Sequence, residues 1–159
     1  MKITIVAAGK IKEKYLTIGI AEFMKRLTPF AKLQIVEISE EKMLDNPSPA
    51  EKAKTLAVEG ERLLRQVPQG SYLIVLDVFG KQLSSEELAT NIEQLGIKGI
   101  SNITFLIGGA FGLSPEVRAA ADLKLSFSKM TFTHQMVRLL LVEQIYRAFK
   151  ISRGEKYHW

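Results

Sequence analysis

The sequence contains no cysteine and only two histidines, His134 and His158. Without cysteine the chain can form neither disulfide bonds nor thiolate metal sites. Two histidines this far apart in the sequence make a poor metal site, so we expect no metal ion.

Long apolar runs are also missing. A membrane-spanning helix needs about 20 consecutive apolar residues, so we expect no association with a membrane. The apolar run at residues 3–8 is too short for a secretory signal and is typical of a first strand. Together with the lack of cysteine, this favours a cytoplasmic protein.

The composition is that of an ordinary globular protein, with 47% hydrophobic and 25% charged residues. A length of 159 residues is enough to bury a core, so we expect a single domain over residues 1–159. The formal net charge of +5 favours a polyanionic partner, although many proteins with such an excess bind no nucleic acid.

Strand and helix patterns alternate along the whole chain. Ser48, followed by Pro49 and Glu51, has the pattern of a capped helix start, and Ser84 with Glu87 repeats it. The predicted strands cover residues 3–8, 33–38, 72–77, 102–107 and 123–126, and the predicted helices cover residues 15–27, 49–67, 85–95, 115–121 and 133–152. Unbroken apolar strands are typical of parallel sheets. We therefore predict an α/β fold, a mostly parallel sheet flanked by helices on both faces.

Three segments follow predicted strands: residues 76–80, 108–113 and 127–132. Ligands of parallel sheets bind beyond the carboxyl ends of the strands, so these segments are candidates for a binding site. The three glycines of the second segment allow a close approach of backbone to a ligand, but their spacing matches neither the dinucleotide-binding motif nor the P-loop. A tight turn that binds nothing is the alternative.

The third segment, residues 127–132, is rich in phenylalanine, methionine, serine and threonine. Its apolar side chains can form a flat surface for a ring, and its main chain can form hydrogen bonds with the edge of a heterocycle. The alternative is a plain connection in which Thr131 or Thr133 caps the next helix. The two roles are compatible.

The last predicted helix, residues 133–152, is apolar nearly all round. A surface helix has a single apolar stripe, so this helix must be buried on two sides. One side can pack on the sheet and the other on a second copy of the chain, which predicts an isologous dimer. A central helix buried within one chain is the alternative. His134 at its start is expected to make local hydrogen bonds.

Basic residues gather near the end of this helix, at Arg147, Lys150, Arg153 and Lys156, and Tyr157, His158 and Trp159 follow them. Such a basic group is commonly a solvated face. Aromatic rings can also stack on splayed-out bases while cations hold the phosphates. Exposed aromatic rings on a free tail suggest that they bind to a partner chain or to RNA.

In combination these motifs resemble the RlmH family, a minimal branch of the SPOUT (trefoil-knot) methyltransferases. The resemblance covers essentially the whole chain and rests on FLIGGAFGLS at residues 105–114, LSFSKMTFTH at 125–134, RLLLVEQIYRA at 138–148, the pair Tyr157-His158, and Leu76-Asp77 with Gly80-Lys81. The tail departs from the family, because Lys156 stands where relatives have proline and Trp159 replaces a short polar ending.

The resemblance implies a homodimer with a C-terminal trefoil knot. It implies an S-adenosylmethionine-dependent enzyme that methylates N3 of a pseudouridine in 23S ribosomal RNA of the large subunit. Because so small a domain has little surface for reading an RNA sequence, we expect the substrate to be the assembled ribosome. The implied cofactor contacts are Leu76, Gly108, Phe127, Ser128, Lys129, Met130, Thr131 and Phe132.

For the reaction, we expect His158 from the tail of a partner subunit to act as general base, oriented by Tyr157. We expect Arg147, Lys150, Arg153 and Lys156 to bind RNA. Two other functions stay open: a SPOUT methyltransferase acting on tRNA or ribose, and a non-enzymatic dimeric RNA-binding module. A flavodoxin-like nucleotide-binding domain is a more distant alternative, because its phosphate loop would follow the first strand.

Overall fold

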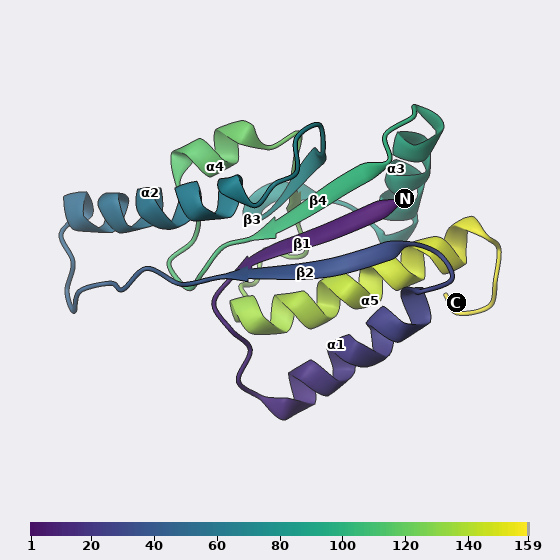
Figure 1. The fold of residues 1–159 in the computed structure, drawn as a ribbon, viewed down its shortest axis with the longest axis horizontal. Coiled ribbons are helices and arrows are strands. Elements are labelled where there is room, and N and C mark those ends of the chain that lie inside the picture. Colours follow the sequence, from purple (N-terminus) through teal and green to yellow (C-terminus); the bar gives the residue numbers. More distant parts are fainter. Residues whose placement is uncertain (159) are drawn as a thin grey trace.

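Strands and helices alternate in the computed structural model, which describes residues 1–158 (Figure 1). The strands are β1 (Lys2–Ala8), β2 (Lys32–Ile38), β3 (Tyr72–Gln82), β4 (Asn102–Ile107) and β5 (Leu123–Ser126). The helices are α1 (Lys14–Leu27), α2 (Pro49–Arg65), α3 (Ser85–Ile97), α4 (Pro115–Ala120) and α5 (His134–Ser152). Each predicted element is present.

The strands form one sheet in the order β2-β1-β4-β3-β5, and all four strand pairings are parallel. The prediction of a parallel α/β fold is thus confirmed. Because the strands are parallel, their carboxyl ends lie along one edge of the sheet, where the loops that follow β3, β4 and β5 meet.

Helices cover both faces of the sheet. In Figure 1, α1 and α5 lie on one side of the strands and α2 and α4 on the other. The buried side chains divide accordingly: Phe105 and Ile107 of β4 belong to the core beneath α1, α3 and α5, while Leu106 belongs to the core beneath α2 and α4. This alternation is that of a strand buried on both faces.

The predicted helix starts are confirmed in detail. The side chains of Ser48, Ser84, Ser114 and Thr133 each accept a hydrogen bond from the backbone N–H three residues on. Ser84 and Glu87 form a reciprocal capping box. Thr133 is therefore the cap of α5.

The main correction concerns β3, which continues five residues beyond its predicted end at Asp77, to Gln82. The extension pairs with β5 after a register shift between Leu76 and Lys81. Gly80 permits the pairing, because a Cβ there would lie 2.6 Å from the backbone of Lys124. A glycine that resembles a turn residue in the sequence is instead a point where two strands come together.

Helix α5 packs against both α1 and α3 within the chain. Its buried residues include Arg138, which is 1% exposed. Arg138 forms an ion pair with Glu37 at 2.6 Å and donates hydrogen bonds to the carbonyl oxygens of Ala8 and Gly9 at 3.1 and 2.7 Å. Much of the apolar circumference of α5 is thus covered inside one chain, as in the central-helix alternative. The dimer and the knot stay predictions.

Candidate functional site

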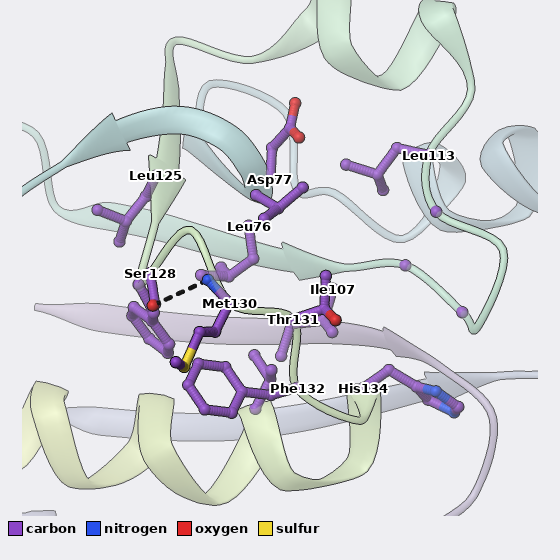
Figure 2. Close-up of a pocket in the computed structure, with 16 residues that line it drawn as sticks. Leu76, Asp77, Ile107, Leu113, Leu125, Ser128, Met130, Thr131, Phe132 and His134 are labelled. Carbon is purple, nitrogen blue, oxygen red and sulfur yellow. Dashed lines mark hydrogen bonds between the residues drawn. The ribbon is translucent and has the colours of Figure 1, made fainter.

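A pocket lies at the carboxyl edge of the sheet, where the three predicted segments meet (Figure 2). Its cavity volume is about 140 Å³, and the cavity is open to solvent on one side. Most of its walls are apolar. It is lined by Leu76, Asp77, Val78, Ile107, Gly108, Gly109, Gly112, Leu113, Leu125, Phe127, Ser128, Met130, Thr131, Phe132, His134 and Val137.

The structure brings together seven of the eight residues expected around the cofactor. Leu76 comes from β3, Gly108 follows β4, and the others come from the loop of residues 127–132. Lys129 belongs to the same loop but is not among the lining residues.

The glycine turn of residues 108–112 forms one wall of the pocket. Gly112 has a φ of +93°, and its N–H donates to the carbonyl oxygen of Gly109 at 3.2 Å. A Cβ on Gly108 would lie 2.7 Å from the Cδ2 atom of Leu113 and 2.8 Å from the carbonyl oxygen of Gly112. The turn is therefore tight, and it also lines the cavity. Ligand binding by these glycines stays a prediction.

The loop of residues 127–132 is shaped by its own hydroxyl groups. Ser126 Oγ donates to the carbonyl oxygen of Ser128 at 3.0 Å. Ser128 Oγ accepts from the N–H of Met130, also at 3.0 Å (Figure 2). The loop is neither helix nor strand, so no regular ladder occupies its main chain. Met130 and Phe132 stand at the mouth, 75% and 42% exposed.

Asp77 is a lining residue that the sequence did not single out as a contact. Its Oδ2 atom lies 3.0 Å from Nε of Arg118 in α4, and its Oδ1 atom accepts from the N–H of Phe79 at 3.1 Å. The carboxylate points away from Met130 and Phe132 in Figure 2. It joins the end of β3 to α4 and so fixes one wall of the pocket.

His134 also lines the pocket, and the expectation of local hydrogen bonds for its side chain was wrong. Its Nε2 atom pairs instead with Oε1 of Glu40 at 3.0 Å. Glu40 follows β2, far away in the sequence, so no local pattern could have predicted the contact.

Glu59 of α2 is the least expected residue near the site, since it is an acid with only 6% exposure. It accepts hydrogen bonds from the N–H groups of Gly109 and Glu41. Burial raises the pKa of Glu59, and these two hydrogen bonds oppose the shift in part. Its place in a largely polar helix gave no hint that it would be buried.

A second cavity adjoins the first and shares Leu125, Phe127 and Phe132 with it. The rest of its lining comes from the connection after β3, the start of α3 and one side of α5: Leu83, Ser84, Ser85, Leu88, Leu140 and Gln144. A ligand in the first cavity therefore has a neighbouring space on the α3 side.

The tail folds back onto its own chain. Tyr157 donates its hydroxyl hydrogen to Oε1 of Glu143 at 3.0 Å. The ring of His158 contacts Arg147 through Nδ1 at 3.1 Å and Glu86 through Nε2 at 2.5 Å. Neither aromatic residue is among those that line the pocket of the same chain. Burial first, and the contact with Glu143 second, raise the pKa of Tyr157. Trp159 lies outside the described residues.

The four basic residues expected to bind RNA differ in their surroundings. Arg147 pairs with Glu143 at 2.5 Å, and Lys150 pairs with Glu155. Arg153 lies over the ring of Phe30, 4.6 Å from its centroid, and has only a long contact of 3.9 Å with Oε1 of Glu155, so its side chain is exposed. Lys156 is exposed. Arg153 and Lys156 are therefore the more available cations.

Two other kinds of feature are absent from residues 1–158. No three acidic or histidine side chains lie together in a way that could hold a metal ion. No helix in this range is both long and apolar enough to span a bilayer.

The sheet and the pocket at its carboxyl edge define an α/β protein with a candidate small-molecule site beyond the ends of its parallel strands. A probable methylase family protein from Haemophilus influenzae superposes with a TM-score of 0.53 at 13% identity, over 99% of this chain and 70% of that one. The tRNA (m1G37) methyltransferase from Aquifex aeolicus superposes with a TM-score of 0.52 at 12% identity, over 92% and 70%. At such low identity these likenesses show the fold alone.

Sequence comparison gives the family. The family model described as "Predicted SPOUT methyltransferase" matches residues 1–158. Proteins named ribosomal RNA large subunit methyltransferase H from Halothermothrix orenii and Carboxydothermus hydrogenoformans are each 56% identical over 158 residues, 99% of both chains. The counterpart from Alkaliphilus oremlandii is 54% identical over the same share. The chain belongs to the RlmH family of SPOUT methyltransferases, which confirms the resemblance seen in its motifs.

Proposed function

We propose that this protein transfers the methyl group of S-adenosylmethionine to N3 of a pseudouridine in 23S ribosomal RNA. The observation that carries the proposal is the full-length 56% identity to proteins named ribosomal RNA large subunit methyltransferase H. The structure supports it with a pocket at the place where a parallel sheet binds ligands.

The lining of the pocket fits the chemistry of the cofactor. Its apolar walls, among them Leu76, Phe127 and Phe132, suit the flat adenine ring, and the open main chain of residues 127–132 can recognise the edge of that ring. Gly108 allows the backbone to approach closely. When bound, the cofactor supplies a methyl group that its sulfonium already activates.

The protein must then hold the methyl acceptor in line and take its proton. Positioning alone can contribute roughly 7–11 kcal/mol toward lowering the barrier. His158 would take the N3 proton, so that N3 could accept the methyl group while the electron pair of the carbon–sulfur bond stays on sulfur. Tyr157 orients the imidazole, and a general base of this kind contributes about 10²–10⁴-fold.

We propose that His158 and Tyr157 act from the tail of a partner subunit in a homodimer. In its own chain the tail lies against α3 and α5, and neither residue lines the pocket. A second copy with twofold symmetry would bring its tail beside the first copy's pocket. The C-terminal knot that the family implies belongs to the same proposal.

The proposed substrate is the large-subunit RNA in the assembled ribosome, in the cytoplasm. A domain of 159 residues has little surface with which to read an RNA sequence, so recognition by ribosomal architecture is expected. Arg147, Lys150, Arg153 and Lys156 would hold the phosphates.

Mass spectrometry of 23S RNA from cells with and without the gene tests the proposal. We expect one nucleotide of the RNA from the deletion strain to be lighter by about 14 mass units, the difference between a methyl group and a hydrogen atom. Purified protein with S-adenosylmethionine should restore this methyl group on ribosomes. Loss of a ribose methylation or of a tRNA methylation instead would contradict it. Efficient methylation of a short RNA hairpin would contradict the ribosome as substrate.

The non-enzymatic alternative is tested by calorimetry. An enzyme should bind both S-adenosylmethionine and S-adenosylhomocysteine, because the product keeps most of the contacts of the cofactor. A dimer that binds RNA but neither compound would be a binding module. The only observation that relates to the tRNA-directed alternative is the fold that this chain shares with the Aquifex aeolicus enzyme.

A further inference from the structure

The glycine turn is held from outside the pocket by one carboxylate of α2. Oε1 of Glu59 accepts a hydrogen bond from the N–H of Gly109 at 3.2 Å, and Oε2 accepts one from the N–H of Glu41 at 3.3 Å. A Cβ on Gly109 would lie 3.0 Å from Oε1, so the carboxylate also packs directly against the turn. A single buried side chain therefore joins the turn after β4 to the connection after β2.

The environment of this carboxylate is unfavourable for its charge. Burial raises the pKa of Glu59, and Glu40 nearby acts in the same direction, while His134 and the two backbone N–H groups oppose it. Burying a charged group without a close cation costs stability, and such groups concentrate at functional sites. Because the buried carboxylate lowers stability, we look for its role in the shape of the adjoining pocket wall.

The hydrogen bond to Gly109 determines how the preceding peptide group is turned. A trans peptide is planar, and its N–H and C=O point in opposite directions. The N–H of Gly109 is directed at Glu59 on the α2 side. The carbonyl oxygen of the same peptide belongs to Gly108 and therefore points away from Glu59, and both glycines line the pocket.

We propose that Glu59 is a positioning residue for the cofactor site. By holding the N–H of Gly109, it directs the carbonyl oxygen of Gly108 into the pocket, where the oxygen accepts a hydrogen bond from an amino or hydroxyl group of the methyl donor. The identity of that ligand rests on the proposed function, whereas the ordering of the turn by Glu59 does not.

The substitution Glu59→Gln tests this inference. Glutamine has the same shape but only one acceptor oxygen, so its amide NH₂ group must face one of the two N–H donors. We expect faster amide hydrogen exchange in residues 108–113 of the cofactor-free protein. We also expect binding of S-adenosylhomocysteine to weaken about tenfold, because a charge-assisted hydrogen bond that orders the site is lost. At saturating S-adenosylmethionine, kcat should stay within about twofold of wild type, so the effect falls on KM.

Glu61→Gln is the matched control. Glu61 lies on the same helix, but its side chain is exposed and paired with Arg65 at 2.6 Å. This variant should leave the exchange of the turn, the affinity and KM unchanged. If both variants weaken binding equally, the effect is one of net charge and the inference fails.

The outcomes separate the inference from the proposed function. Unchanged exchange in the turn of Glu59→Gln overturns the positioning role, whatever the protein binds. Wild type that binds neither cofactor form overturns the proposed function and the assigned ligand, while the exchange result still decides whether Glu59 orders the turn. If Glu59→Gln does not fold, wild type decides: a Gly109 amide that exchanges as fast as an unstructured peptide overturns the inference.

Discussion

Tyr157 donates its hydroxyl hydrogen to Glu143, 14 residues earlier in the chain, across 3.0 Å. Glu143 also forms an ion pair with Arg147, so a single carboxylate holds both the aromatic tail and one of the basic residues expected to bind RNA. In this arrangement neither catalytic candidate lines the pocket of its own chain. This placement is the reason for the proposal that the tail acts on the pocket of a second copy.

Subunit complementation tests whether the tail acts in trans. Gly108→Val, which fills the pocket wall, and His158→Ala, which removes the base, should each lower turnover by about 10²–10⁴-fold. When the two inactive variants are mixed and allowed to exchange subunits, about a quarter of wild-type activity should return, since half of the dimers are mixed and each mixed dimer has one intact site. No recovery would show that pocket and tail act within one chain. Full turnover of His158→Ala with unchanged cofactor binding would rule out His158 as the base.

The close packing of the glycine turn predicts a strong effect from a single methyl group. Gly108→Ala places a Cβ 2.7 Å from Leu113 and 2.8 Å from the carbonyl of Gly112, so the turn must shift. We expect S-adenosylhomocysteine to bind at least about tenfold more weakly by calorimetry, a loss near 1.4 kcal/mol.

Gly96→Ala is the control for this substitution. Gly96 lies in α3, where the added Cβ would meet only Met1 at an ordinary 3.5 Å. It should leave cofactor affinity unchanged and stabilise the helix by about 0.5–1 kcal/mol. Equal losses of affinity in both variants would show that the pocket wall is not specifically involved.

Arg153 has the surroundings of a phosphate contact, with an exposed guanidinium stacked on Phe30. Arg153→Ala should weaken RNA or ribosome binding and reduce the slope of log K against log salt by about one. Lys52→Ala, an exposed change near the start of α2, should alter neither. An unaltered salt slope in Arg153→Ala would remove this residue from the RNA interface.

Local sequence patterns were sufficient to predict the elements of the fold. Serine and threonine caps define where four of the helices begin, because a cap needs only a few neighbouring residues. The strand order was not predictable, since the apolar pattern says that a strand is buried but not which strand lies beside it. The extension of β3 was missed for the same reason, as its partner is β5.

The residues of the candidate site also fall into those that local sequence patterns predict and those that depend on contacts between distant elements. The segments around Gly108 and Phe127 could be predicted because each follows a strand in a parallel sheet, and Leu76 was found with them although β3 continues past it. Glu59 and the partner of His134 could not, because their contacts join distant elements. A buried acid in a polar helix has the same sequence pattern as an exposed one.

The raised pKa of Glu59 predicts an unusual pH dependence of stability. A carboxyl group whose pKa is higher in the folded state binds its proton more tightly when folded. Its contribution to stability is complete below the ordinary value of 4.5 and is lost as pH rises through the folded value. Urea unfolding of wild type and Glu59→Gln across this range should show the difference in unfolding free energy, wild type minus variant, falling as pH increases above 4.5. The exposed Glu61→Gln should give a flat difference. A difference for Glu59→Gln that rises with pH would mean that the hydrogen bonds from Gly109 and Glu41 outweigh burial.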